Sequence, residues 1–216
     1  MSIRSHNFVK DEFYHIYIHS IEDLKIFPKK RDYERFLTLM FAANNKGEIP
    51  RLERHSGLNL AWDIVTGKVK LEEPLIDIVC FCLMPTHFHL LLRERKDGNI
   101  SKYLHRILLS HSKYINIKYE RRGHLFESKF NSKHVDTNGY LLTLSSYIHK
   151  NPKDLPDWKD KEDKYQWSSY QDFINQNRWN NLLSKNIIID QFKNNKEYKN
   201  FVEENYQNID SNLNLT

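Results

Sequence analysis

The chain has 216 residues, which is enough for one domain with a sizeable core plus a tail or an insert. Its 33 Lys and Arg residues against 28 Asp and Glu residues give a net charge of +5, too modest to indicate a polyanionic partner by itself. No stretch has the length of a membrane span and residues 1–25 lack a signal core, so we expect a cytoplasmic protein without a membrane partner. Cys80 and Cys82 stand in one apolar run, which predicts buried thiols rather than a disulfide.

The first half of the chain predicts a strand, a helix and a hairpin. Residues 13–20 alternate as a strand does, and residues 31–43 place apolar side chains at helical spacing. Residues 44–74 break the pattern with three glycines and two prolines, and we interpret them as an insert or a long, partly ordered loop. The apolar run 75–84 predicts a buried strand, and residues 87–94 return beside it after a Pro-Thr turn.

The second half predicts a helix at 100–119, a strand at 125–135 and a further helix at 138–149 that ends before a proline. Residues 186–205 of the tail also have helical spacing. The first six elements follow the order strand, helix, strand, strand, helix, strand. This order predicts an α+β protein with a ferredoxin-like βαββαβ core, a central antiparallel sheet and two helices on one face.

His87 and His89 are the first candidate site residues. They stand two apart on a predicted strand, so both imidazoles point to one face while Phe88 points into the core. Two adjacent imidazoles are half of a divalent-metal site. The alternative is a pair of polar residues on a solvated strand face.

Tyr147 and Asn151 lie one turn apart on one side of the helical segment 138–151, on the stripe that should face the protein. A polar Asn on that face needs a partner, and a metal that accepts its amide oxygen is one. A capping role for Asn151 before Pro152 and simple packing of Tyr147 are the alternatives.

Several segments carry a family resemblance when taken together. The run LMPTHFHLLLRE resembles the metal motif of the HUH endonucleases. The segments FYHIYIHS, SKYINIKYERRGHLFESKF, YLLTLSSYIHKNP and the later WSSY resemble the REP-associated tyrosine transposases, which are single-tyrosine HUH transposases of the IS200-like kind. The resemblance covers roughly residues 8–175, and the order and spacing of the motifs make it specific.

The resemblance implies a metal-dependent endonuclease and strand transferase, a transposase, that acts on single-stranded or hairpin-forming DNA. Tyr147 would be the nucleophile that forms a 5′-phosphotyrosine, and Asn151 would join His87 and His89 as a ligand of Mg²⁺ or Mn²⁺. Tyr114, in SKYIN, is the rival nucleophile, although core packing also explains it.

The resemblance also implies a domain division and a set of DNA contacts. An HUH transposase catalytic domain would occupy residues 1–155, with the insert at 44–74, and residues 156–216 would be an extension that packs on the domain or on DNA. Trp167 and Tyr170 would stack on bases or anchor this extension. Phosphate contacts are predicted for Arg106, Lys113, Arg121, Arg122, Lys129 and Lys133, each with a solvated surface charge as the alternative. A homodimer stays open, since related transposases include dimers.

Two other functions compete with a transposase. One is a non-catalytic, sequence-specific DNA-binding regulator that retains the fold. The other is a metallohydrolase that activates a bound water, which is weakened by the lack of Asp or Glu in the two motifs.

Overall fold

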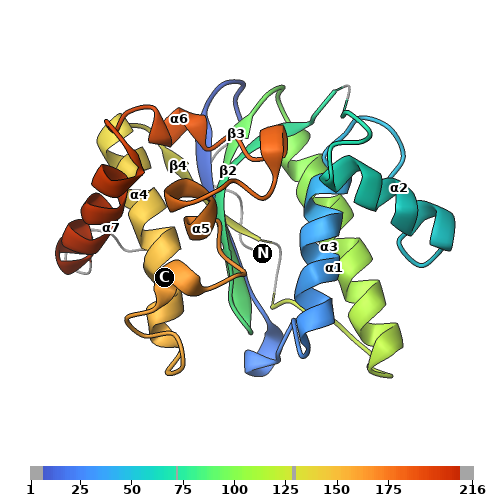
Figure 1. Ribbon diagram of the computed structural model, residues 1–216. Helices are drawn as coiled ribbons and strands as arrows, with labels where there is room; N and C mark the ends of the chain where they lie inside the picture. Colours follow the sequence, from blue (N-terminus) through green and yellow to red (C-terminus); the bar gives the residue numbers. More distant parts are fainter. Residues whose placement is uncertain (1–6, 72, 128–129, 210–216) are drawn as a thin grey trace.

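A four-stranded antiparallel sheet forms the centre of the computed structural model, which describes residues 7–71, 73–127 and 130–209 (Figure 1). The strand order is β2-β3-β1-β4. The strands are β1 (Phe13–His19), β2 (Ile76–Leu83), β3 (His87–Glu94) and β4 (Asn131–Val135). Each helical connection of the core therefore passes over one intervening strand, which is the ferredoxin-like arrangement predicted from the sequence, and the prediction is confirmed.

Helices cover both faces of this sheet. Figure 1 shows α1 (Lys30–Ala42) and α3 (Asn99–Lys118) on one side and α4 (Asn138–Lys150) on the other, with α7 (Asn195–Ile209) packed outside α4. The remaining helices are α2 (His55–Val65), α5 (Tyr170–Ile174), α6 (Asn186–Ile189) and the short 3-10 turns Ile21–Asp23, Asn151–Asp154, Glu162–Lys164 and Asn180–Leu182. In the described part of the chain, no helix combines the length and apolarity that crossing a bilayer requires.

Strand alternation divides the side chains of the sheet between two layers. Phe88 points toward α1, where its ring contacts that of Phe36, and the neighbouring positions Leu90 and Leu92 are fully buried on the same face. The alternate positions of β1 and β3 face α4 instead. In the antiparallel register, His87 pairs with His19 and His89 pairs with Tyr17, so these polar residues share the α4 face.

The segment 44–74 differs from its predicted loop, because residues 55–65 form helix α2, which packs against α1. Ala61, Ile64 and Val65 form its buried stripe at helical spacing. The sequence contains that helical spacing, but the glycines and prolines around it led to the prediction of a loop.

Two further predicted elements are shorter than expected. The strand expected at 125–135 is regular only over β4, and Phe126 makes an isolated bridge with Ser20. The single helix expected over 186–205 is divided into α6 and α7. The division follows from Asn194, whose side-chain oxygen accepts the backbone N–H of Glu197 and so begins a new helix.

Residues 165–184 cover the open edge of β2. The backbone N–H of Ser169 donates to Phe81, and that of Ser184 donates to Ile78, which satisfies carbonyl groups that an edge strand would otherwise expose. Trp167 and Tyr170 are buried, and the ring of Trp167 stacks on Tyr33 at 4.6 Å between centroids. Trp167 thus packs on α1 and Tyr170 packs on His149 of α4, so these buried rings anchor the extension to the domain and are not available to stack on bases.

Candidate active site

The two histidines of β3 point toward α4, as their spacing predicts. His89 is almost fully buried and His87 is partly buried. Both lie near the centre of the sheet, because β3 is flanked by β2 and β1. The strand thus presents two imidazoles side by side under a helix, with ring centroids 5.2 Å apart.

Helix α4 brings Tyr147 and Asn151 over these imidazoles. Its first turn is capped by Thr137, whose hydroxyl accepts the backbone N–H of Tyr140, and its apolar stripe of Leu141, Leu144 and Ile148 packs toward the sheet. The same stripe carries the two polar residues at the end of the helix. The structure therefore brings together all four side chains that the sequence singled out from β3 and α4.

The contacts between the four side chains are close. Nε2 of His87 lies 3.3 Å from Oδ1 of Asn151. The ring of Tyr147 stands edge-on to that of His89, with centroids 5.5 Å apart and planes at 85°. A phenol, two imidazoles and an amide oxygen thus share one small volume between the sheet and the C-terminal end of α4.

The Nδ1 atom of each histidine has a partner on the protein side. Nδ1 of His87 lies 3.2 Å from Oγ1 of Thr86, and Nδ1 of His89 lies 2.9 Å from Nε2 of His15. When the proton sits on Nδ1, the lone pair on Nε2 is left for a ligand. Both imidazoles therefore have a partner at the second ring nitrogen, as histidines that ligate metals usually do.

Burial keeps the two imidazoles neutral. Burial, together with a smaller contribution from the neighbouring His19, lowers the pKa of His87 to about 4. Burial and the adjacent His15 and His87 lower the pKa of His89 well below its ordinary range. A neutral imidazole is the form that ligates a metal, so no proton has to leave either ring at neutral pH.

The donor set fits a divalent cation that accepts mixed nitrogen and oxygen ligands. Nε2 of His87 and Oδ1 of Asn151 face each other, and both can supply a lone pair. Among the described residues, no three His, Cys, Asp or Glu side chains gather as a metal site, so a third protein donor beside the two imidazoles would have to be the amide oxygen of Asn151. Such a set leaves coordination positions for phosphate oxygens and water.

Sequence reasoning missed the contribution of β1 to this site. His15, Tyr17 and His19 lie on the same face of β1 and form the rest of the floor below α4. The ring of His19 stacks on His87 at 4.8 Å, and the ring of His15 stacks on His89 at 5.2 Å. The alternation in FYHIYIH was a signal for one shared face, but only the strand register shows which histidines meet.

Tyr114, the rival nucleophile, lies in a different layer. Its hydroxyl donates to Oδ1 of the buried Asp32 at 2.8 Å, and Nζ of Lys118 donates to the same hydroxyl. The guanidinium of Arg35 lies 4.0 Å above its ring. Tyr114 is therefore held between α1 and α3, across the sheet from His87 and His89.

The predicted DNA contacts are dispersed. Arg106 donates to the backbone carbonyls of residues 45 and 46, and Arg121 donates to the side chain of Asn116, so both have structural partners. Lys113 and Arg122 are exposed, on α3 and after it. Lys133 pairs with His15 in the register of β1 and β4, which puts it on the α4 face. Lys129 lies outside the described residues.

A buried polar network centred on His149 holds α4 in place. Nε2 of His149 lies 2.8 Å from the hydroxyl of Ser169, and Nδ1 lies 2.7 Å from the hydroxyl of Tyr198 on α7. All three side chains are inaccessible to solvent, so the Ser-His pair serves as an anchor and not as a catalytic dyad. The network joins α4 to two parts of the extension, at Ser169 and at Tyr198 of α7. These contacts fix the rotation of the helix that carries Tyr147.

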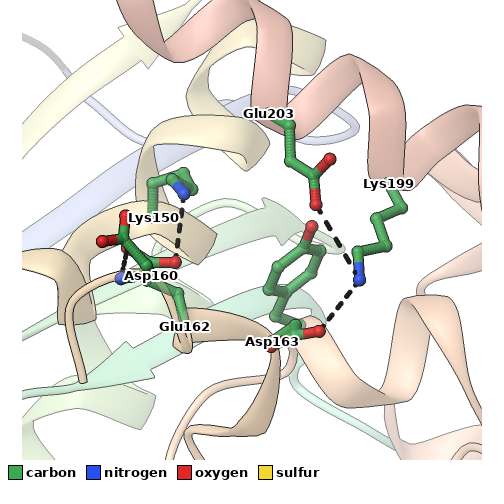
Figure 2. Close-up of a pocket in the computed structure, with 7 residues that line it drawn as sticks. Lys150, Asp160, Glu162, Asp163, Lys199 and Glu203 are labelled. Atoms are coloured by element: carbon green, nitrogen blue, oxygen red, sulfur yellow. Dashed lines mark hydrogen bonds and ion pairs between the residues drawn. The ribbon is translucent and has the colours of Figure 1, made fainter.

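A cavity of about 280 Å³ beside the end of α4 is lined by ion pairs. Figure 2 shows Lys199 of α7 between Asp163 and Glu203, and Nζ of Lys150 lies 3.1 Å from Glu162. Each of the two lysines thus has a carboxylate partner. These pairs tie the last turn of α4 to the extension, next to the position of Asn151.

Comparison with known proteins supports the same family as the sequence motifs. Residues 66–151, which include His87, His89, Tyr147 and Asn151, match the family model described as "Transposase IS200 like". No protein of curated function matches the chain.

A solved structure described as "Structure of the REP associates tyrosine transposase bound to a REP hairpin" has a similar fold, with a TM-score of 0.57. The match covers 81% of this chain and 86% of that chain at 10% sequence identity, so the likeness is one of fold. Over residues 66–151 the family model agrees with the resemblance to the IS200-like transposases, and the solved structure shows that the fold is shared.

Proposed function

We propose that the protein is a metal-dependent single-stranded DNA endonuclease and strand transferase that uses Tyr147 as its nucleophile. One observation carries the proposal: the Tyr147 ring stands edge-on over His89, while Asn151 of the same helix faces Nε2 of His87. A nucleophile and a cation-binding donor set are thus held by two rigid elements in one volume. Such an arrangement suits phosphoryl transfer, which depends on positioning and charge neutralisation.

The reaction exchanges one phosphate ester for another. The phenolic oxygen of Tyr147 forms a bond to phosphorus, the bond from phosphorus to the 3′ oxygen breaks, and a 5′-phosphotyrosine and a free 3′-OH result. The phenol loses its proton to water, and the leaving oxygen takes one up. Because the energy of the ester is kept in the covalent product, a new 3′-OH reverses the step and joins strands without an energy cofactor.

His87, His89 and Asn151 would hold Mg²⁺ or Mn²⁺. When bound, such an ion neutralises charge on the scissile phosphate and orients it. The protein contributes neutral imidazoles, a fixed amide oxygen and a site largely shielded from water, with Asn151 only 5% exposed. The oxygen ligand and the phosphate substrate favour these hard cations in use.

The DNA substrate of the proposal is single-stranded and hairpin-forming. The solved relative is bound to a REP hairpin, and the shared fold supports a partner of the same kind. Lys133 lies on the face that carries the four site residues and would contact a phosphate there. A cytoplasmic location and a homodimer remain predictions.

The test is formation of a covalent adduct. The protein is mixed with labelled single-stranded DNA that carries a hairpin, in the presence of Mg²⁺ or Mn²⁺, and then denatured and separated on a gel. We expect a protein-linked fragment that is lost in Tyr147→Phe and retained in Tyr114→Phe. Cleavage without an adduct would instead indicate a metallohydrolase, and binding without cleavage a DNA-binding regulator.

A further inference from the structure

His15 makes an unusual contact with His89. It lies on β1, its side chain is fully buried, and its Nε2 lies 2.9 Å from Nδ1 of His89. The two rings stack at 5.2 Å with planes 19° apart. His15 is thus joined by a hydrogen bond to one of the two imidazoles of the proposed metal site, from the neighbouring strand.

Within the described part of the chain, the side chain of His15 makes a hydrogen bond through Nε2 alone, because its Nδ1 is buried without a partner. Burying an imidazole with one nitrogen unpaired costs free energy. A leucine would fill a similar volume without that cost. Packing alone therefore does not explain an imidazole here, and its contact with His89 is what distinguishes it from an apolar residue.

The direction of the hydrogen bond follows from what His89 has to do. To ligate a cation through Nε2, the neutral ring must carry its proton on Nδ1, which then donates to Nε2 of His15. Thr86 stands in the same relation to His87, with its Oγ1 3.2 Å from Nδ1. Each of the two imidazoles therefore has a partner at Nδ1 that can fix its ring orientation and its tautomer.

We propose that His15 is a positioning residue that accepts the Nδ1 proton of His89 and so presents the Nε2 lone pair of His89 to the metal. The inference rests on the proposed function, because it needs a metal at His89. It goes further because it assigns the control of the His89 tautomer to a residue of β1, a strand that does not carry the paired histidine motif.

Metal affinity of the DNA-free protein tests the proposal separately from catalysis. Mn²⁺ binding is measured by calorimetry and by the loss of the free-ion electron paramagnetic resonance signal. His15→Leu removes the acceptor and should weaken Mn²⁺ binding by about 10- to 100-fold, the usual effect of losing an outer-shell partner. His15→Gln places an acceptor oxygen near the position of Nε2 and should restore most of the affinity.

His111→Leu is the matched control. His111 is equally buried, but it lies on the opposite side of the sheet, where its Nε2 donates to the carbonyl of Ile26. This variant should lose stability and keep the parent affinity for Mn²⁺. Circular dichroism of each variant, recorded under the binding conditions, identifies the folded samples that are compared.

A second measurement needs no substitution at all. Nitrogen-15 spectra of the histidine rings in the metal-free parent protein should show the proton of His89 on Nδ1. A proton on Nε2, or unchanged Mn²⁺ affinity in folded His15→Leu, would overturn the role of His15. Absence of Mn²⁺ binding by the parent protein would overturn the proposed metal site as well, so the two failures are distinguishable.

Discussion

The two faces of the sheet each carry a tyrosine and at least one buried histidine, but the hydrogen-bond partners of these side chains differ. On the α1/α3 face, Tyr114 donates to the carboxylate of Asp32, and His111 donates to a backbone carbonyl. On the α4 face, Tyr147 lies over His89, and the nitrogens of His15 and His89 meet each other. The first face pairs its tyrosine and its histidine with protein acceptors, whereas the second brings a phenol, two imidazoles and an amide oxygen into one small volume. Residue type alone therefore does not distinguish a structural layer from a candidate active site.

On the first face, the buried carboxylate of Asp32 is the acceptor that gathers several donors. The carboxylate accepts hydrogen bonds from Tyr114, Tyr119, Lys118 and the backbone of Lys29. Burial, with a further contribution from Asp32, raises the pKa of Tyr114, although Lys118 opposes the shift. A phenol that donates to a carboxylate is held in its protonated form, which is the wrong form for a nucleophile.

The largest effect is expected when the α4 face loses a metal donor. His89→Ala should slow adduct formation on hairpin-bearing DNA by about 100-fold or more, because a bound cation supplies several kcal/mol of charge stabilisation. His111→Ala removes a buried histidine from the other face and should leave the rate of the folded enzyme near that of the parent. Similar losses of rate in both variants would remove the distinction between the two faces.

The next effect is on stability and concerns Tyr114. Tyr114→Phe deletes a hydrogen bond to a buried carboxylate and should lower the free energy of unfolding by about 1.5 to 3 kcal/mol. The yield of covalent adduct should stay unchanged. Urea unfolding followed by circular dichroism gives the first quantity, and a denaturing gel gives the second. A stable Tyr114→Phe variant that forms no adduct would instead identify Tyr114, on the α1/α3 face, as the nucleophile.

The network behind α4 makes stability depend on pH. Burial lowers the pKa of His149 from its ordinary 6.5 to about 3. Between these values the unfolded chain binds a proton that the folded chain does not, so this residue makes stability fall as pH falls from about 6.5 toward 3. In His149→Gln the slope of unfolding free energy against pH should be smaller by up to about 1.4 kcal/mol per pH unit. An unchanged slope between pH 6 and 5 would contradict a neutral, buried His149.

The smallest effect is expected for the basic side chains. Lys133→Gln, on the α4 face, should lower the salt dependence of single-stranded DNA binding by about one unit of log affinity against log salt concentration. Lys113→Gln, on α3, is the matched control and should change this slope less. Fluorescence anisotropy over a range of salt concentrations measures both slopes. An equal decrease of the slope in both variants would show that DNA approaches the α1/α3 face as closely as the α4 face.

Local spacing was sufficient to predict much of the fold and the centre of the site. Alternation in β1, the apolar run of β2 and helical periodicity in α1 and α3 led to the βαββαβ order, and the same periodicity predicted α4 after it. The two-residue spacing of His87 and His89 gives their common face, and the four-residue spacing of Tyr147 and Asn151 gives theirs. These are short-range properties that depend on one element at a time.

The remaining features depend on how separate elements meet. The contact between His15 and His89 follows from the register of β1 against β3, which no local pattern specifies. Tyr114 could be separated from Tyr147 only once its partner Asp32, on another helix, was known. The burial of Trp167 likewise follows from the way in which the extension covers the edge of β2.

Mapping the covalent bond within the protein tests the role of Tyr147 most directly. The adduct formed on hairpin-bearing DNA is digested with nuclease and trypsin, and the modified peptide is sequenced by mass spectrometry. The peptide of residues 134–150 contains both Tyr140 and Tyr147, so the fragment ions also distinguish these neighbours. We predict a 5′-linked nucleotide on Tyr147, and a nucleotide on Tyr114 or Tyr140 instead would contradict the proposed site.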